Sequence, residues 1–295
     1  MDVSNILFFI LKGLEISAPI AFAALGAVFS ERSGVVNMAL EGFMLVCAFF
    51  IVWASLKFQN PWMGLLVAVL VGVLMALLHA VVTVTFRADQ IVSGVAINIF
   101  ALGLSRFLCQ RFYGQETQTP SNSYLFPQIA IGNSQINTIA FWLIPVTILS
   151  WFILKKTVFG LRLRTVGENP EAADTLGINV YLMRYSGVIL SGVFCGLSAA
   201  TLYPSQWVSG MTAGRGYIAL AAMIFGRWNP IGAVLASLLF GYADTFRIVY
   251  GERIPIPNQF VQMFPYVLAL IVLAGFIGKA KAPAADGKPY EKSED

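Results

Sequence analysis

Polar side chains inside apolar segments are the residues of this sequence most able to do chemistry. Five of them lie in or at the edges of such segments: Asn37, Glu41, Gln90, Ser93 and Asn98. A carboxylate at membrane depth costs at least about 2–3 kcal/mol, so it usually faces a cavity or a partner. We therefore treat the five as a candidate pathway for a polar solute. Hydrogen bonding between helices is the other interpretation, and it stays open for all of them.

The other reactive side chains do not suggest a catalytic or metal site. Cys47, Cys109 and Cys195 each lie inside an apolar segment, where cysteine behaves as a small hydrophobic residue. His79 is the only histidine, and one histidine cannot build a metal site. The sequence has no Gly-x-x-x-x-Gly-Lys-Ser/Thr phosphate loop, so we expect no ATP binding by that route. No cofactor or metal is expected on this chain, and an intramembrane enzyme is disfavoured.

Residues 165–180 predict a short helix with its own caps. Asn169 is a good N-cap, Pro170 fits the first helical position, and Glu171 favours the positive end of the helix dipole. Gly177 can take the left-handed conformation that ends a helix. Since so short a helix is marginal alone, we interpret it as a docking element for another protein. A simple connecting turn is the alternative.

The elements that carry these residues are predicted to lie in lipid. Hydrophobic residues make up 58% of the 295 residues, charged residues only 12%, and the mean hydropathy is +0.75. A soluble domain of this length is usually about half apolar and a quarter charged. The composition therefore predicts an all-α polytopic transmembrane helical bundle in the lipid bilayer. The net charge of +4 includes no basic run interleaved with aromatics, so nucleic acid is not an expected partner.

Nine stretches are long enough to be considered as crossings of a hydrocarbon core of about 30 Å. They are residues 6–29, 38–56, 62–86, 91–112, 138–155, 183–203, 217–225, 231–250 and 259–277. The seventh is short, and the second begins in a polar stretch that could re-enter the membrane instead of crossing it. Lys12 and Glu15 interrupt the first stretch, so we interpret it as a span and not as a cleaved signal peptide.

Basic residues predict the orientation. They gather around the loop after the fifth stretch, at Lys155, Lys156, Arg162, Arg164 and Arg184, and again in the C-terminal tail. Both regions should be cytoplasmic by the positive-inside rule, and nine spans then place the N-terminus outside. Residues 1–278 form one transmembrane domain in this interpretation. Residues 279–295 have no periodic apolar positions, so a disordered cytoplasmic tail is predicted.

Two Asn-Pro turns suggest internal symmetry. Asn60-Pro61 and Asn229-Pro230 each precede an apolar stretch, and the predicted topology places them on opposite sides of the membrane. Stretches one to four would then relate to stretches six to nine as an inverted repeat with interrupted helices, which is common in transporters. The alternative is that Asn-Pro is simply a favoured turn.

Small and aromatic residues have structural interpretations first. Close helix packing is predicted for the small residues Gly192, Gly196 and Ala200. Three aromatic residues could stack a base near the outer mouth, or could anchor the chain at the membrane interface: Tyr203, Trp207 and Tyr217.

Four stretches together resemble the permeases of ABC importers of the branched-chain amino acid, ribose and nucleoside group. Residues 167–180, with the run Gly-Glu-Asn-Pro-Glu-Ala-Ala, resemble the coupling loop of that family, here about residues 156–182. Residues 30–44 resemble its interrupted second helix, 88–98 its fourth-span entry and 214–230 its late signature. The resemblance implies coupling to an ATPase through Gly167, Glu168, Asn169, Pro170, Glu171, Ala172, Ala173, Asp174, Leu176 and Gly177.

The pattern is most similar to the nucleoside branch of that group. Ribose-type permeases have Gly-Ile-Asp-Leu-Ser where this chain has Gly-Val-Val-Asn-Met at residues 34–38. They also have Gly-Gly-rich sequence where this chain has Phe-Gly-Arg-Trp at residues 225–228. Ala39 and Cys47 stand where the family often has glycine, and both replacements are small. The resemblance implies a heterodimer of a longer and a shorter permease, and this chain looks like the shorter one.

The resemblance implies that the chain is the permease subunit of an ATP-driven importer in the bacterial inner membrane. It would move nucleosides or related small polar solutes by alternating access. The implied partners are a cytoplasmic ATP-binding subunit, which would hold the ATP, a second permease subunit, and an extracytoplasmic solute-binding protein. The possible inverted repeat and Glu41 leave an ion-coupled secondary transporter as the alternative.

Overall fold

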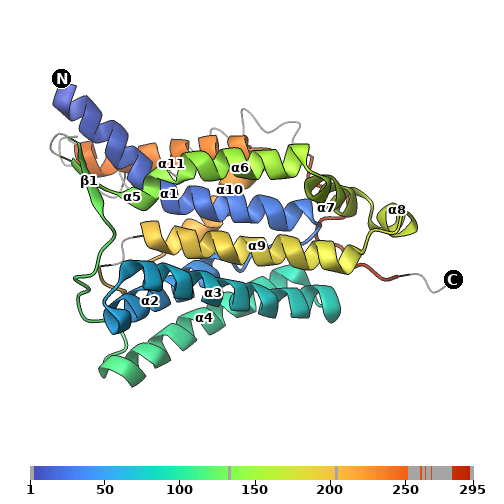
Figure 1. The fold of residues 1–295 in the computed structure, drawn as a ribbon, viewed down its shortest axis with the longest axis horizontal. Coiled ribbons are helices and arrows are strands. Elements are labelled where there is room, and N and C mark those ends of the chain that lie inside the picture. The colour runs from blue at the N-terminus through green and yellow to red at the C-terminus, as the bar shows by residue number, and fades with distance from the viewer. Residues whose placement is uncertain are drawn as a thin grey trace.

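A computed structural model describes residues 3–131, 134–202, 205–251, 260, 263, 267 and 281–292. Helices form almost all of the regular structure in this part of the chain, which confirms the predicted all-α bundle. One antiparallel pair of short strands, β1 (Gln128–Ile131) and β2 (Ser134–Asn137), lies in a loop between long helices. Figure 1 shows the long helices side by side, with the two ends of the chain at opposite ends of the bundle.

The helices have the following bounds in chain order: α1 (Val3–Arg32), α2 (Leu40–Phe58), α3 (Pro61–Ala80), the π-helical turn η1 (Val81–Thr85), α4 (Gln90–Tyr113), α5 (Thr138–Phe141), α6 (Leu143–Lys156), α7 (Val158–Glu168), α8 (Pro170–Thr175), α9 (Val180–Thr201), α10 (Arg215–Phe225) and α11 (Pro230–Tyr250). Seven stretches of the described chain are long and apolar enough to cross a membrane. They match the predicted spans one to six and eight. The predicted ninth span, residues 259–277, lies outside the described residues apart from three positions.

The predicted seventh span needs correction. It corresponds to α10, which has 11 residues and therefore rises only about 16 Å, roughly half of a hydrocarbon core. The segment before it is not helical. Ser209 donates its backbone N–H to the Thr117 carbonyl, and Thr119 donates its N–H to the Trp207 carbonyl, so residues 205–209 lie along the loop that follows α4.

Helix directions show that this half-length helix is still part of a crossing. Ser198 of α9 donates to the Pro19 carbonyl of α1, while Gly187 lies against Ser33, so α9 is antiparallel to α1. Tyr242 of α11 donates to the Ile10 carbonyl near the start of α1. The first residues of α11 follow Trp228, whose carbonyl accepts from Arg32 at the end of α1. Because α9 and α11 are therefore parallel, the chain between them must return across the bundle.

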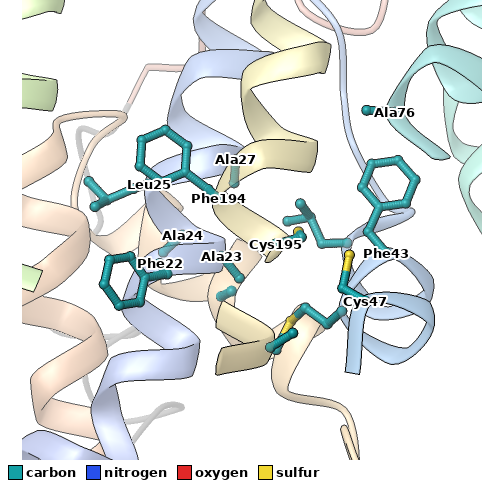
Figure 2. Packing of buried hydrophobic residues seen from close by; sticks show 14 of the residues in the cluster. Phe22, Ala23, Ala24, Leu25, Ala27, Phe43, Cys47, Ala76, Phe194 and Cys195 are labelled. Atoms are coloured by element: carbon teal, nitrogen blue, oxygen red, sulfur yellow. The ribbon is translucent and has the colours of Figure 1, made fainter. Parts of the chain in front are cut away.

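Close packing of α1, α3 and α9 forms the centre of the molecule. A Cβ atom on Gly192 of α9 would collide with the backbone of Gly72 on α3, and one on Gly196 would collide with Val69. Ala200 is fully buried, so the predicted close packing of this face is confirmed. Figure 2 shows the buried cluster where α1 and α9 cross, with alanines of α1 and Phe194 of α9 inside it. Such tight contact is typical of membrane helices with small residues at their interface.

The two Asn-Pro turns begin helices that run in opposite directions. The side chain of Asn60 accepts from the Trp62 N–H at the start of α3, and Asn229 accepts from the Ile231 N–H at the start of α11. Gly72 and Val69 of α3 face Gly192 and Gly196 of α9 in that reversed order, so α3 is parallel to α1 and antiparallel to α11. An inverted repeat requires this arrangement, and the repeat itself stays a prediction.

Candidate functional site

An interrupted segment, residues 33–39 between α1 and α2, is the centre of the candidate site. The Val36 N–H donates to Gln90 Oε1 of α4 over 2.7 Å, and the Val36 carbonyl lies 3.2 Å from His79 Nε2 of α3. The other ring nitrogen of His79 lies 3.0 Å from the Ser93 hydroxyl of α4. Side chains of α3 and α4 thus supply hydrogen bonds that this non-helical backbone cannot make within itself.

Two asparagines hold the second half of the interruption. Asn37 donates to the Ser191 hydroxyl of α9 over 2.7 Å and accepts from the Ala39 N–H. Asn98 of α4 accepts from the Gly42 N–H and donates to the Met38 carbonyl, over 2.7 and 2.8 Å. The interruption is therefore tied to α9 on one side and to α4 on the other.

Glu41 binds the beginning of the half-length helix α10. One carboxylate oxygen accepts from the Gly214 N–H over 2.8 Å, and the other accepts from the Gly216 N–H over 2.7 Å. The first N–H groups of a helix lack partners within it and carry partial positive charge, which a carboxylate satisfies on both counts. Gly216 permits this approach, because a Cβ atom there would collide with the Glu41 backbone.

All five predicted pathway residues therefore come together around one interruption. Each of them forms hydrogen bonds with backbone groups or with neighbouring side chains. Asn37, Gln90 and Ser93 are buried, whereas Glu41 and Asn98 are half-buried. Tyr217 of α10 adds an exposed surface to this group, because its hydroxyl accepts from Asn98 over 3.0 Å while 43% of the residue is exposed.

Sequence reasoning missed or misplaced several members of this network. His79 was given no role, yet it is fully buried and joins the interruption to Ser93. Trp207 is also fully buried, packed edge-to-face on Phe49 at 5.4 Å. Both interpretations from the sequence, base stacking at the outer mouth and anchoring at the membrane interface, are therefore wrong for this residue. Tyr203 lies outside the described residues. A histidine at the end of an apolar run carries no sequence signal for partners in the interrupted segment and on α4.

The second candidate site is the helix predicted after Asn169. The structure places α8 there, with the Asn169 side chain accepting from the Ala172 N–H over 3.0 Å, Pro170 at the first position and Gly177 at a φ of 77°. The predicted capping is confirmed. Figure 1 shows α7 and α8 projecting from the end of the bundle opposite the N-terminus. Leu176, at the tip, is 76% exposed.

The residues in and around this helix divide into exposed and buried positions. Glu168, Asn169, Glu171, Ala172 and Gly177 are exposed, Pro170 and Asp174 are half-buried, and Gly167 and Ala173 are buried. A Cβ atom on Gly167 would collide with the backbone of Arg32. Gly167 and Ala173 thus hold the helix against its own chain, while Glu171 and Leu176 are free to meet another surface.

The C-terminal residues 281–292 lie against this loop, which differs from the disorder that composition predicts. The Ala285 N–H donates to the Gly167 carbonyl over 2.9 Å, and Ala285 and Tyr290 are buried. Asp286 lies beside the Glu31 carboxyl group, and burial raises the pKa of Asp286 to about 7, although Glu31 and Arg184 act to lower it. A composition without periodic apolar residues does not exclude order where a few small and aromatic side chains meet a preformed surface.

A polytopic bundle with interrupted elements at its centre and a capped helix projecting from one end is the architecture of a membrane transport protein. Comparison with known proteins identifies its family. Residues 9–273 match the family described as branched-chain amino acid transport system / permease component, and the chain belongs to this family. It is accordingly a permease subunit of an ABC importer and a multi-pass inner-membrane protein. Such a permease works with an ATPase subunit and a solute-binding protein.

Several relatives match over most or all of their length. The chain is 44% identical to the guanosine ABC transporter permease protein NupQ of Bacillus subtilis, and the match covers 100% of both chains. It is 48% identical to the nucleoside ABC transporter permease protein NupC of Lactococcus lactis, again over 100% of both chains. A more distant relative is the guanosine ABC transporter permease protein NupP of B. subtilis, 22% identical over 91% of this chain and 83% of NupP.

Proposed function

We propose that the chain is the shorter permease subunit of a nucleoside importer, and that it pairs with a second, different permease. The observation that carries the nucleoside assignment is identity of 44% and 48% over full length to permeases named for guanosine and nucleosides. The pairing is supported by NupP and NupQ, two different guanosine permease proteins of one bacterium that both match this chain.

The coupling role of α8 is supported by its position and exposure. The helix projects from the bundle, and Glu171 and Leu176 are exposed. We infer that ATP is bound and hydrolysed on the partner subunit, and that α8 passes the resulting movement to the bundle. The exposed residues of the predicted coupling site would contact the partner. The buried residues Gly167 and Ala173 would pack against the rest of the chain and hold the exposed ones in position.

The solute pathway is proposed to pass beside Asn98, Glu41 and Tyr217. These three keep accessible surface, and all contact α10 or belong to it. Asn37, Gln90 and Ser93 would support the pathway from behind, because they are buried and hold the interrupted segment. Tyr217 offers a ring on which a nucleobase could stack, and such stacking is worth about 1–3 kcal/mol per base.

An ion-coupled mechanism is not favoured. The family to which the chain belongs is driven by ATPase subunits. Glu41, which motivated that alternative, has both oxygens engaged by backbone N–H groups of α10. The carboxylate therefore has a structural role, because it holds the beginning of α10.

The experiment uses the complete importer in lipid nanodiscs, with the ATPase subunit, second permease and solute-binding protein. ATPase activity is measured with guanosine, other nucleosides, free bases, ribose and glucose. We expect stimulation by a nucleoside, loss of that stimulation in Glu171→Arg, and normal stimulation in the control Glu116→Arg, an exposed position in the loop after α4. Absence of a co-purifying ATPase, with solute flux that follows an ion gradient instead, would overturn the proposal.

A further inference from the structure

The C-terminal residues 281–292 contact the chain at both ends of the coupling helix α8. We propose that this segment, here called the tail strap, positions α8 for the ATPase subunit, an inference that rests on the coupling role proposed for α8. The Ala285 N–H donates to the Gly167 carbonyl just before the helix, and the Ala284 N–H lies 3.3 Å from a carboxylate oxygen of Glu168. Near the other end of α8, Lys292 lies 3.9 Å from Asp174.

The tail strap is also fixed to the helix bundle. Arg184 of α9, which is only 1% exposed, donates to the Lys288 carbonyl over 2.9 Å. The buried ring of Tyr290 lies 5.6 Å from that of Tyr181 on α9 and 6.0 Å from the Arg184 guanidinium. Arg87, between η1 and α4, pairs with Glu291. The tail strap therefore joins α8 to two parts of the bundle that lie far apart in sequence.

The short helix needs such support. It has six residues, and isolated helices shorter than about 12 residues are marginal in water. Between α8 and the tail strap lies a recess of about 700 Å³, lined by residues of both, including Glu171, Lys288 and Glu291. Without the tail strap, the face of α8 that borders this recess would lose its neighbours. A partner that pushes on α8 would then move a loose helix instead of the bundle.

A pair of neighbouring carboxyl groups connects the tail strap to α1. Asp286 of the tail strap lies beside Glu31 at the end of α1, and the same Glu31 accepts from the Trp228 indole N–H over 2.7 Å. Trp228 lies between α10 and α11, and its carbonyl accepts from Arg32. Through Asp286 the tail strap thus contacts a cluster that connects α1 with the half-length helix. Movement of α8 therefore has a short physical route to the interrupted elements.

The test compares matched alanine positions in the full importer complex. Ala285→Arg places a long side chain at a buried contact, whereas Ala282→Arg makes the same change at an exposed position of the same segment. We expect Ala285→Arg to lower nucleoside-stimulated ATPase activity roughly tenfold, within the range typical of coupling between sites. The KM for ATP should not change, because the ATP site lies on the partner. Ala282→Arg and the conservative Ala285→Ser should match wild type.

A chain truncated after residue 280 keeps the test decisive if Ala285→Arg does not assemble, since truncation inserts no bulky group. It should lose stimulation in the same way. Wild-type or higher stimulation in the truncated complex, with Glu171→Arg still inactive, would overturn the tail strap and leave the proposed function standing. Normal activity of Glu171→Arg as well would show instead that α8 is not the coupling site.

Discussion

Polar side chains in the membrane-embedded part of this chain satisfy backbone groups before they can do anything else. In residues 33–39 the N–H and carbonyl groups of Val36 use Gln90 and His79. The backbone groups of Met38 and Gly42 use Asn98. Each unsatisfied group in lipid would cost several kcal/mol, so an interruption is stable only where neighbouring helices supply such partners. Polar residues therefore occur around the interruption because its backbone needs their hydrogen bonds.

Glu41→Gln tests this at the start of α10. Glutamine has one acceptor oxygen, so either the Gly214 or the Gly216 N–H would lose its partner. We expect the free energy of unfolding to fall by about 1–3 kcal/mol, the cost of one unsatisfied buried donor. Thermal unfolding of the detergent-purified chain measures the change, and Glu116→Gln in an exposed loop is the control. Equal melting temperatures for Glu41→Gln and wild type would contradict the argument.

The sequence alone identified the residue types of the site better than their roles. Five polar residues could be identified by their positions within apolar stretches of the sequence, and they do meet around residues 33–39. Their partners could not be identified in this way, since His79, Ser191 and Tyr217 come from three other helices and carry no local signal. Trp207 shows the same limit, because burial against Phe49 depends on how the loop after α9 folds back.

At the scale of the helix, local signals predicted beginnings and ends well. The side chains of Asn60, Asn169 and Asn229 all accept from the N–H groups that follow them, with proline next in each case. These signals act over three or four residues, so they can be read directly from the chain. The short stretch at residues 217–225 was predicted, and α10 ends at Phe225 as expected. The binding of its beginning by Glu41 was not predicted, because that carboxylate comes from another helix.

Gly192→Val tests the packing of α9 on α3. The added side chain would collide with the backbone of Gly72 and with Ala76, and overpacking of a tight core typically costs about 1–3 kcal/mol. We expect a lower yield of monodisperse protein and a lower melting temperature. Gly103→Val is a matched control on α4, since no atom lies within 4 Å of a Cβ atom there. A melting temperature that falls equally in both variants would contradict a specific role for the α3–α9 contact.

At the scale of the whole molecule, the outer helices present the surface that lipid or a second subunit must cover. Leu74 of α3, Ile99 and Phe107 of α4, and Ile148 of α6 are each more than 60% exposed. Apolar surface of this extent predicts a hydrocarbon environment, and the family assignment agrees. Composition alone was sufficient for this conclusion, because it depends on how much polar surface exists and not on where it lies.

A different second permease should occupy part of this surface. When this chain is tagged and purified with the proteins encoded beside it, native mass spectrometry should find one copy of it with one copy of a longer permease. The expectation follows from the two guanosine permeases of B. subtilis, both of which match this chain. Expression of this chain alone with the ATPase subunit is the control, and it should give no active complex. Two copies of this chain in an active importer would refute the pairing.

The contact between Gly72 and Gly192 restricts which parts of the importer can move. Two helices that touch through their backbones have no intervening side chains that could change rotamer, so we expect α3 and α9 to move together. Ser198 joins α1 to the same unit through the Pro19 carbonyl. The helices α1, α3 and α9 should therefore move as one rigid unit. We expect the conformational change of transport to occur around these three helices, where α4 and α10 meet through side chains such as Asn98 and Tyr217.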